Sequence, residues 1–423
     1  MKFPSMAEPD GRTLGDEEAA ALERVIRSGM LSSVWGTEAR ALESEIAELH
    51  GVRHAVACSS GTAALHLAVV AAAPDPGDEI ITTPITDFGT VAPILAQNAV
   101  PVFADVDPSD GNLDPAAVAA LIGPRTRAII AVHLFGAPAR VDELRALADA
   151  HGLALIEDCA QAWLTELPPL DAARPAGTDR SGAGADGGGP DDGSADGGGT
   201  AGGAGVRLAG TVGDVACLSL QQWKHITCGD GGLALTGDDE LARRMRLFSD
   251  KGWDRAAGRS HATFGLNYRM TELQAAVARA QLAKLPGVVA ARRRTAVQLL
   301  EALRGIPGVR LPRPEGHAWW LFPVVLPGGG AAELAGRLRA AGIPARAGYL
   351  EEPLHRAPVW QGPIYGRSRY PLRDHTSHAC PEAERMVAET LLVIDWNENY
   401  TAEHVRFIAR EMAASSSRSG IGH

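Results

Sequence analysis

The sequence predicts an α/β fold: a mostly parallel sheet of seven strands, followed by a smaller α+β domain. Short β-rich runs alternate with helical patterns from about Val52 to Thr236, an order typical of a parallel sheet with helices on both faces. Several runs, such as Ala128–His133, are apolar throughout, as strands buried on both faces are. After Gly265 this alternation ends, which indicates a second domain of different architecture.

The elements of the large domain follow in order along the chain. Its strands are expected at the β-rich runs Ala55–Cys58, Glu79–Thr82, Val102–Asp105, Ala128–His133, Ala154–Glu157, Val215–Leu220 and Leu233–Thr236. Helical patterns fill the intervals between the first five runs, at Thr62–Ala73, Thr90–Gln97, Pro115–Ile122 and Val141–His151. We therefore expect residues 1–285 to form the large domain.

The small domain is expected over residues 286–423. A long helical pattern, Thr271–Arg304, leads out of the sheet and is expected to break near Pro286. Strand candidates follow at Trp319–Leu326 and Pro344–Leu350, and helix candidates at Ala331–Ala341, Pro381–Leu391 and Ala402–Ala414. This order is that of an α+β domain.

One segment interrupts the large domain. Residues 167–206 hold 13 of the chain's 48 glycines and almost no bulky apolar side chain. Such a segment cannot bury enough surface to offset its ordering entropy. We therefore interpret it as a flexible surface insertion between two strands of the core.

Composition and charge argue against several classes of protein. The net charge of −11 is unfavourable for nucleic-acid binding, and no apolar run is long enough to span a bilayer. The five cysteines are odd in number and widely spaced, which fits neither a disulfide framework nor a zinc site. We expect a cytoplasmic protein with free thiols and no bound metal.

Lys224 is the most informative residue of the sequence. It follows the strand candidate Val215–Leu220 and leads into a glycine-rich turn at residues 228–232. A lysine delivered by a buried strand can be desolvated, which lowers its pKa and makes it a nucleophile toward an aldehyde. The alternative interpretation is a strand-end lysine that reaches for water, and Lys224 alone does not decide between the two.

Two other motifs complement this lysine. Ser59-Ser-Gly-Thr62 joins a strand to a helix, and such a junction presents free N–H groups and a positive dipole end to a phosphate. Asp158 ends an apolar strand, at the edge where open α/β sheets hold ligands, and an acid there can pair with a protonated pyridine nitrogen. Ordinary helix capping is the alternative explanation for either motif alone.

Together, a phosphate cup, an acid for a ring nitrogen and a lysine for an aldehyde are the groups that hold pyridoxal phosphate. Further motifs lie in order at Gly36–Glu43, Ser60–His66, Pro101–Asp107, His133–Gly136, Glu157–Gln161, Gly210–Asp214, the Lys224 segment and Gly265–Gln274. Through these motifs the sequence resembles the sugar aminotransferases of the DegT/StrS type, closely over roughly residues 20 to 305. The resemblance implies the aspartate aminotransferase-like fold.

The resemblance also implies roles for individual residues. Lys224 matches the lysine that binds the cofactor aldehyde and shuttles a proton, and Asp158 matches the acid that pairs with the pyridine nitrogen. The other implied cofactor contacts are Ser60, Gly61 and Thr62 in the phosphate cup, Ser219 at the phosphate, Gln161 near the phenolic oxygen, and Asn267 from a neighbouring subunit. Tyr268 and Arg269 follow Asn267 and are expected to contact substrate. A residue lent by a neighbour implies a homodimer with shared active sites.

The sequence departs from the family at two places. The family stacks an aromatic residue on the cofactor ring, where a gapless alignment places Asp87. Phe88, the next residue, is the expected stacking residue. The insertion at residues 167–206 lies where the family has a short connection, and we expect it to project away from the site.

These features predict an aminotransferase that loads its cofactor from L-glutamate or L-glutamine and aminates a keto sugar or keto-cyclitol in aminosugar, antibiotic or polysaccharide biosynthesis. Two alternatives stay open: a pyridoxal-phosphate-dependent deoxysugar dehydratase, and a regulatory relative without turnover. Dehydratases of the family have a histidine in place of the lysine, whereas here His225 follows Lys224. The presence of Lys224, Asp158 and Ser219 argues against a silent relative.

Overall fold

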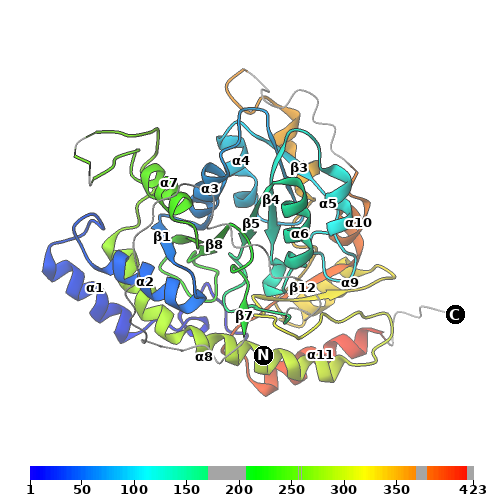
Figure 1. Ribbon diagram of the computed structural model, residues 1–423. Coiled ribbons are helices and arrows are strands. Elements are labelled where there is room, and N and C mark those ends of the chain that lie inside the picture. The colour runs from blue at the N-terminus through cyan, green and yellow to red at the C-terminus, as the bar shows by residue number, and fades with distance from the viewer. Residues whose placement is uncertain (170–205, 256, 259, 368–378, 417–423) are drawn as a thin grey trace.

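The apolar runs of the large domain form one seven-stranded sheet (Figure 1). The computed structural model describes residues 1–169, 206–255, 257–258, 260–367 and 379–416. In spatial order the strands are β1 (His54–Cys58), β9 (Gly232–Thr236), β8 (Val215–Ser219), β5 (Ala154–Asp158), β4 (Thr126–Val132), β2 (Glu79–Thr82) and β3 (Val100–Phe103). Strand β9 is antiparallel to both neighbours, and the remaining pairs of this sheet are parallel. The prediction of a mostly parallel sheet is confirmed.

Helices cover both faces of this sheet. One face packs against α3 (Gly61–Ala72), α4 (Ala92–Ala96) and α7 (Asp239–Ser249). The other face packs against α2 (Glu38–His50), α5 (Pro115–Leu121), α6 (Val141–His151) and the first half of α8 (Glu272–Leu303). Because β1, β5 and β8 run in the same direction, the residues that follow them meet at one edge of the sheet. That edge carries Ser60, Asp158 and Ser219.

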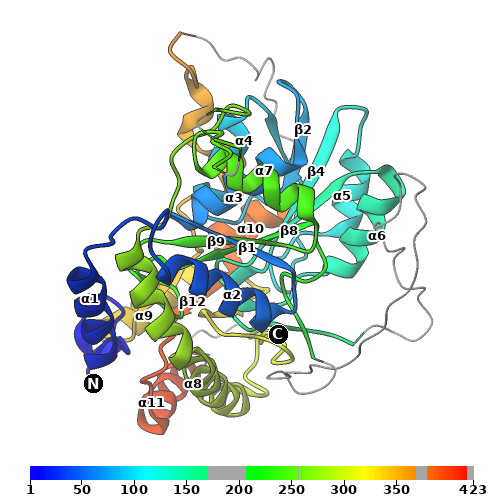
Figure 2. The same ribbon diagram turned by 60° about the vertical axis from the view of Figure 1, so that its left-hand side comes forward.

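Helix α8 runs from Glu272 to Leu303 without interruption, so the predicted break near Pro286 is wrong. Pro286 is exposed, and the carbonyl that its missing N–H leaves free can bind water on that side. The helix also contacts α1 (Asp16–Ser28), α2 and α11 (Ala402–Ser416), and Figure 2 shows it beside α11. Because α8 passes through residue 285, the division of the chain at that point stays a prediction.

The smaller sheet has three strands in the order β10 (Leu321–Val325), β12 (Leu391–Asp395) and β11 (Ala345–Ala347), with both pairs antiparallel. Helices α9 (Ala331–Ala340) and α11, with the second half of α8, share its core. The helix predicted over Pro381–Leu391 is present over residues 381–390. Helix α10 (Pro381–Arg385) and one π-helical turn end at Thr390, and the apolar run that follows is the central strand of the small sheet.

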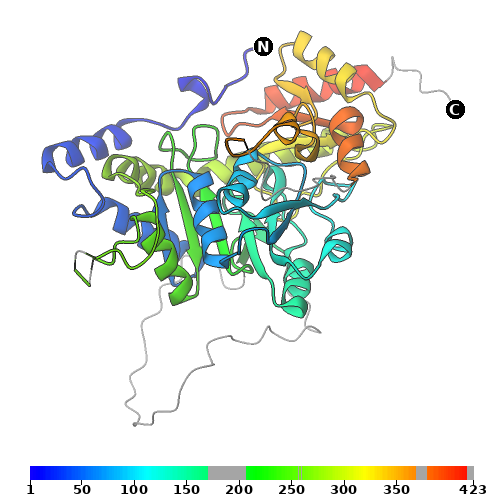
Figure 3. The same ribbon diagram turned by 90° about the horizontal axis from the view of Figure 1, so that it is seen from above.

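The N-terminal segment, residues 1–12, lies against the small domain rather than the large sheet. Phe3 is part of the small domain's core, with its ring 5.4 Å from Tyr400 and 4.9 Å from His404. Figure 3 shows this segment running from α1 to the elements of the small domain. Gly11 accepts a hydrogen bond of 2.9 Å from Asn397 Nδ2. In the large domain, Gln222 Nε2 donates a 3.0 Å bond to Met6 O, so the first residues of the chain contact both parts of the molecule.

A short hairpin marks the site of the predicted insertion. Strands β6 (Glu166–Leu167) and β7 (Arg207–Leu208) are antiparallel, and Leu167 pairs with Arg207. The predicted insertion, residues 167–206, lies between them, and its residues 170–205 lie outside the described residues. Within the described part of the chain, no helix combines the length and apolar character needed to cross a bilayer.

Candidate active site

A cavity of about 1000 Å³ lies between the large sheet and the small domain. It is lined by seven of the residues singled out in the sequence: Ser60, Gly61, Thr62, Asp158, Gln161, Ser219 and Lys224. They come from three separate parts of the chain and meet because β1, β5 and β8 end at the same edge of the sheet. Ligands of open α/β sheets bind at this edge.

The start of α3 forms one end of the cavity. Ser60 caps the helix, and its Oγ accepts a 3.0 Å hydrogen bond from Ala63 N. The other N–H groups of the first turn have no intrahelical acceptor, and the helix dipole adds partial positive charge there. A Cβ at Gly61 would lie 2.8 Å from Cβ and 2.9 Å from Oγ of Ser219. Only glycine lets the serine hydroxyl approach this helix end so closely, which suits a bound phosphate.

Replacing Gly61 by alanine is expected to weaken the binding of pyridoxal phosphate by about 5- to 100-fold, because the new methyl group displaces Ser219 or the helix start at an overpacking cost of about 1–3 kcal/mol. The dissociation constant can be measured by titrating cofactor-free protein with pyridoxal phosphate. Gly123→Ala is a matched control, since a Cβ there meets nothing within 4 Å. Equal affinities in the two variants would contradict the assignment of this helix end.

Asp158 lies at the end of β5 and is buried. Its Oδ2 accepts a 2.8 Å hydrogen bond from Thr90 Oγ1, and its Oδ1 accepts a 3.0 Å bond from Ala160 N. Burial raises the pKa of this carboxyl, although the two hydrogen bonds and the charge of Lys224 oppose that shift. A carboxylate in such a place is stabilised by a cation. A protonated pyridine nitrogen has the required charge.

Lys224 stands in the turn after β8 and is half-buried. Its backbone N donates a 2.9 Å bond to Gln221 O, and its carbonyl accepts a 3.1 Å bond from Arg12 Nη1. Its Nζ lies over the ring of Trp320, 4.3 Å from the ring centroid. Desolvation lowers the pKa of the amine, while Asp158 and Asp87 act in the opposite direction. A lowered pKa increases the fraction of free amine, which is the nucleophilic form.

Gln161 and Ser219 are both held by the protein. Gln161 Oε1 accepts a 2.7 Å bond from Phe135 N, which leaves its amide N–H groups as donors for a ligand oxygen. Ser219 O accepts a 2.9 Å bond from Trp163 Nε1, so the strand end that carries the hydroxyl is fixed. Both residues are buried. Their geometry is compatible with the contacts that the sequence predicts for them.

Phe88 and the segment 267–269 do not line the cavity of their own chain. Phe88 belongs to a neighbouring apolar cluster and lies 6.3 Å from Trp360 between ring centroids, whereas Asp87 and Gly89 line the cavity. The structure therefore corrects the expectation that Phe88 stacks on the cofactor: the backbone places the residues on either side of it at the site. Asn267, Tyr268 and Arg269 are also absent from the lining residues.

The contacts of residues 267–269 explain this placement. Asn267 is exposed and forms an isolated β-bridge with Asp250. Arg269 Nη1 also bonds Asp250, and Tyr268 Oη lies 2.9 Å from His66 Nδ1. Burial lowers the pKa of His66 to about 4, so this ring is neutral and anchors Tyr268 to α3. These contacts attach the segment to α3 and to Asp250 of its own chain.

Three residues at the site, Thr90, Trp320 and Arg12, were not expected from the sequence. Thr90 supports Asp158, and Tyr349 and Trp320 line the cavity from the small-domain side. Arg12 bonds the carbonyl of Lys224. None of them lies in a motif that the sequence analysis used for the site. Only the pair of adjacent tryptophans, Trp319 and Trp320, is an unusual local signal.

Beneath the site, His133, Glu157 and Cys159 place three possible ligand atoms within 4.8 Å of one another. Glu157 already has four protein partners: His133 Nε2 and Gly210 N lie at 3.0 and 2.8 Å from Oε2, and Val212 N and Gly213 N lie at 2.8 and 2.6 Å from Oε1. The carboxylate thus fixes the Gly210–Asp214 motif beside β8. This is a structural explanation for Glu157, the neighbour of Asp158.

The residues present fit pyridoxal phosphate. The helix start with Gly61 and Ser219 suits the phosphate, buried Asp158 suits a pyridinium nitrogen, and half-buried Lys224 suits the aldehyde. The cavity, at about 1000 Å³, also leaves room for a substrate beside such a cofactor.

Solved structures of known proteins are similar to this chain over almost its entire length. DesV of S. venezuelae is 30% identical, with a TM-score of 0.76 and 95% of each chain covered. An aminotransferase from Psychrobacter cryohalolentis is 27% identical, with a TM-score of 0.77 and 96% and 98% coverage of this chain and that chain. 3-Amino-5-hydroxybenzoic acid synthase is 25% identical, with a TM-score of 0.79 and 99% and 100% coverage.

A family model also matches the sequence, over residues 12–412. That range includes both sheets and every residue predicted for the site. The enzymes of the matching family are pyridoxal-phosphate-dependent aminotransferases, in agreement with the fit of the cavity. The chain therefore belongs to the DegT/DnrJ/EryC1/StrS aminotransferase family.

Proposed function

We propose that this chain transfers an amino group from L-glutamate or L-glutamine to the keto group of a sugar or cyclitol in aminosugar or aminocyclitol biosynthesis. The observation that carries the proposal is the meeting of Lys224, Asp158 and the α3 phosphate cup in one cavity. DesI, which is 29% identical, was solved in the presence of its TDP-sugar product. CalS13 of Micromonospora echinospora, which is 25% identical, is a sugar aminotransferase. Both support a sugar as the acceptor.

The cavity wall contributed by the small domain is suited to such substrates. Arg339 and Arg346 line it, and guanidinium groups bind carboxylates and phosphates. Arg346 Nη1 also pairs with Asp395 at 2.9 Å. Trp320 and Tyr349 add aromatic surface to the same wall. A dicarboxylate donor and a polar acceptor can therefore use the same part of the cavity in turn.

The reaction needs a base that moves a proton between carbon atoms. Pyridoxal phosphate, when bound, supplies an aldehyde that joins covalently to amines and a ring that accepts electrons. Lys224 Nζ takes the proton from the α-carbon of the donor and, in the second half-reaction, returns one to the carbon that receives the amine. Asp158 would supply the negative charge that stabilises a protonated pyridine nitrogen, and Ser60, Gly61 and Ser219 would hold the phosphate end.

The test is the visible absorption of the protein loaded with pyridoxal phosphate, recorded before and after L-glutamate or L-glutamine is added. Loss of the yellow band, with one 2-oxo acid formed per site, supports the proposed donor. A keto sugar should then restore the band as the amino sugar forms. A deoxygenated product without consumption of a donor would favour the dehydratase, and a band that no donor or sugar changes would favour a relative without turnover.

We also propose that the protein acts as a homodimer in which Asn267, Tyr268 and Arg269 serve the partner's site. They lie outside the cavity of their own chain, and Asn267 is exposed. If the sites are shared, equal amounts of Lys224→Ala and Asn267→Ala subunits should regain about a quarter of wild-type activity on exchange, because half of the dimers then hold one intact site. No recovery between two inactive variants, or a monomer in sedimentation, would refute sharing.

A further inference from the structure

The amine of Lys224 lies over the face of an aromatic ring from the other domain. Its Nζ is 4.3 Å from the centroid of Trp320, well inside the distance at which a cation is attracted by the ring. Trp320 stands just before β10 and is 6% exposed, and it lines the same cavity as Lys224. The two side chains are 96 positions apart in the sequence (320 minus 224). Only the docking of the small domain brings them together.

Trp320 is fixed by three hydrogen bonds, one from its indole ring and two from its backbone. Its Nε1 donates a 2.7 Å bond to the carbonyl of Trp223, the residue before the lysine. Its backbone N donates a 2.9 Å bond to Phe135 O. Its backbone O accepts a 3.0 Å bond from Arg292 Nη1. The ring therefore cannot rotate away from Lys224 without breaking its hydrogen bond to the carbonyl of Trp223.

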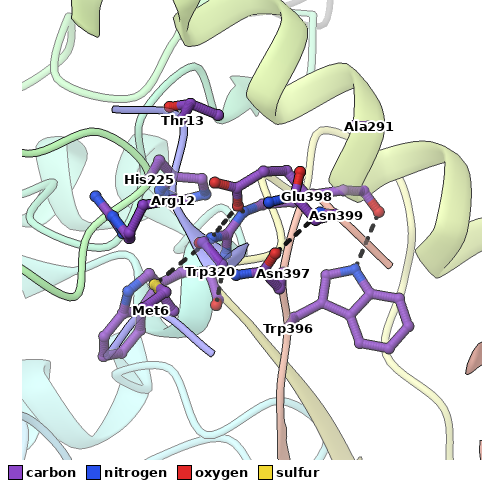
Figure 4. Close-up of polar contacts among 12 residues, drawn as sticks. Met6, Arg12, Thr13, His225, Ala291, Trp320, Trp396, Asn397, Glu398 and Asn399 are labelled. Carbon is purple, nitrogen blue, oxygen red and sulfur yellow. Dashed lines mark hydrogen bonds and ion pairs between the residues drawn. The ribbon is translucent and has the colours of Figure 1, made fainter. Parts of the chain in front are cut away.

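A buried ion pair between Arg292 and Glu398 stabilises the position of Trp320. Arg292 on α8 is fully buried, and its Nε and Nη2 donate 3.0 and 2.7 Å bonds to Glu398 Oε2. Figure 4 shows Glu398 between α8 and the N-terminal segment, with Trp320, Met6 and Arg12 nearby. Arg12 in turn bonds the carbonyl of Lys224. The turn that carries Lys224 is thus held by Trp320 of the small domain and by Arg12 of the N-terminal segment, and Arg292 of α8 in turn holds Trp320.

We propose that Trp320 is a positioning residue for Lys224: its ring face holds the free ammonium group in place between the two half-reactions. This inference rests on the proposed function, in which Lys224 is released from the cofactor whenever the cofactor carries the amine. A free lysine side chain has several rotatable bonds, and without a fixed contact it would have to be ordered again at each turnover, at a cost in conformational entropy. The ring keeps Nζ close to the site, in place for the proton transfer of the next half-reaction.

Other charges also act on this amine. Desolvation lowers its pKa, and the carboxylates of Asp158 and Asp87 raise it. Arg12 bonds the backbone of the same residue, and Tyr349 lies edge-on to Trp320 with a centroid distance of 6.0 Å. The ring face carries no net charge, but it attracts the ammonium group and so acts on the pKa in the same direction as the two carboxylates, which is upward. Replacing the ring by an aliphatic chain keeps the amine away from water but removes that contribution.

The test compares Trp320→Leu with Trp320→Phe in cofactor-free protein. Both variants lose the indole N–H, and only the phenylalanine keeps a ring face for the amine. Competitive acetylation with acetic anhydride across pH, followed by mass spectrometry, gives the pKa of each lysine. The other lysines are Lys2, Lys251 and Lys284, and Lys251 is the internal reference. In Trp320→Leu the pKa of Lys224 should be about one unit below that of the wild type. In Trp320→Phe, which keeps a ring face, it should stay close to the wild-type value.

Three results would overturn the proposal: an unchanged pKa in Trp320→Leu, a rise toward the ordinary value, or an equal fall in both variants. A rise would mean that the indole acts only by excluding water, and an equal fall would mean that only the N–H bond matters. If Trp320→Leu does not fold, Trp320→Met replaces it as a larger aliphatic variant. Because acetylation needs neither cofactor nor donor, these outcomes are independent of whether the enzyme is an aminotransferase.

In the loaded enzyme the same role has a kinetic signature. In the second half-reaction Lys224 must first take up a proton before it can pass one to the acceptor carbon, so this step needs the unprotonated amine. The acid limb of its rate profile in Trp320→Leu should therefore lie at a lower pH than in the wild type, by the same shift as in the acetylation experiment. A merely structural role would lower the rate at every pH by the same factor. A parallel loss of that kind would also count against the proposal.

Discussion

Replacing Lys224 by alanine is expected to reduce the rate of amine transfer by about 10⁴-fold or more, because the variant loses both the nucleophile and the proton-transferring base. The phosphate cup and Asp158 do not depend on this side chain for their hydrogen bonds. The variant should therefore still bind pyridoxamine phosphate, which needs no covalent link to the lysine.

The measurement is single-turnover absorption with L-glutamate, combined with a binding titration of pyridoxamine phosphate. Lys224→Arg is the matched control, because it keeps a cation over Trp320 but provides no free amine at neutral pH. Both variants should bind the cofactor and fail to transfer the amine. Transfer at near wild-type rates in either variant would remove Lys224 from the mechanism.

Replacing Asp158 by asparagine is expected to slow both half-reactions by about 10²- to 10⁴-fold, which corresponds to the roughly 3–5 kcal/mol that follows removal of one partner from a buried ion pair. The asparagine keeps the shape of the side chain: its oxygen can accept the bond from Ala160 N, and its amide nitrogen can donate to Thr90 Oγ1. It cannot neutralise a protonated ring nitrogen. The expected kinetic result is a fall in kcat larger than any change in the KM for the donor, measured by stopped-flow absorption.

The same substitution should have the opposite effect on the stability of cofactor-free protein. Burial raises the pKa of Asp158 above its ordinary value, so the folded state disfavours the ionised carboxylate. A group with a raised folded pKa contributes stability at low pH and loses it as the pH rises past its unfolded pKa. Urea unfolding should therefore show Asp158→Asn gaining stability relative to the wild type between about pH 4 and pH 8. A constant difference across that range would contradict the assignment.

Much of the large domain follows from local sequence, because strands buried on both faces must be apolar along their whole length. The run Ile129–Val132 is an example, because it is buried along its whole length in β4. The run Leu391–Ile394 is equally buried, yet it follows a helical pattern without a break. Periodicity alone does not separate the end of a buried helix from a short central strand, and this strand was missed for that reason.

The candidate site was predictable only where one segment carries both the chemistry and its position. Asp158 ends β5, and Gly61 and Lys224 lie within a few residues of the ends of β1 and β8, so their placement at one edge follows from the order of the sheet. Trp320 reaches the site from another domain, and no local pattern encodes that docking. Phe88 shows that a prediction from alignment can also fail by one position. Asp87 and Gly89 line the cavity, whereas Phe88 between them packs into the neighbouring apolar cluster.

The pairing of Leu167 with Arg207 has a consequence for how this fold can change over time. Directly opposed residues of an antiparallel pair lie about 5 Å apart, and a turn of two residues is enough to join them. The hairpin therefore closes whatever the length of the chain that connects its ends. Gene rearrangement, or a protein engineer, can exchange that connection for a reporter or a tethered module without altering the register of the main sheet. The connection between β6 and β7 is therefore a position where the fold can accept an inserted segment.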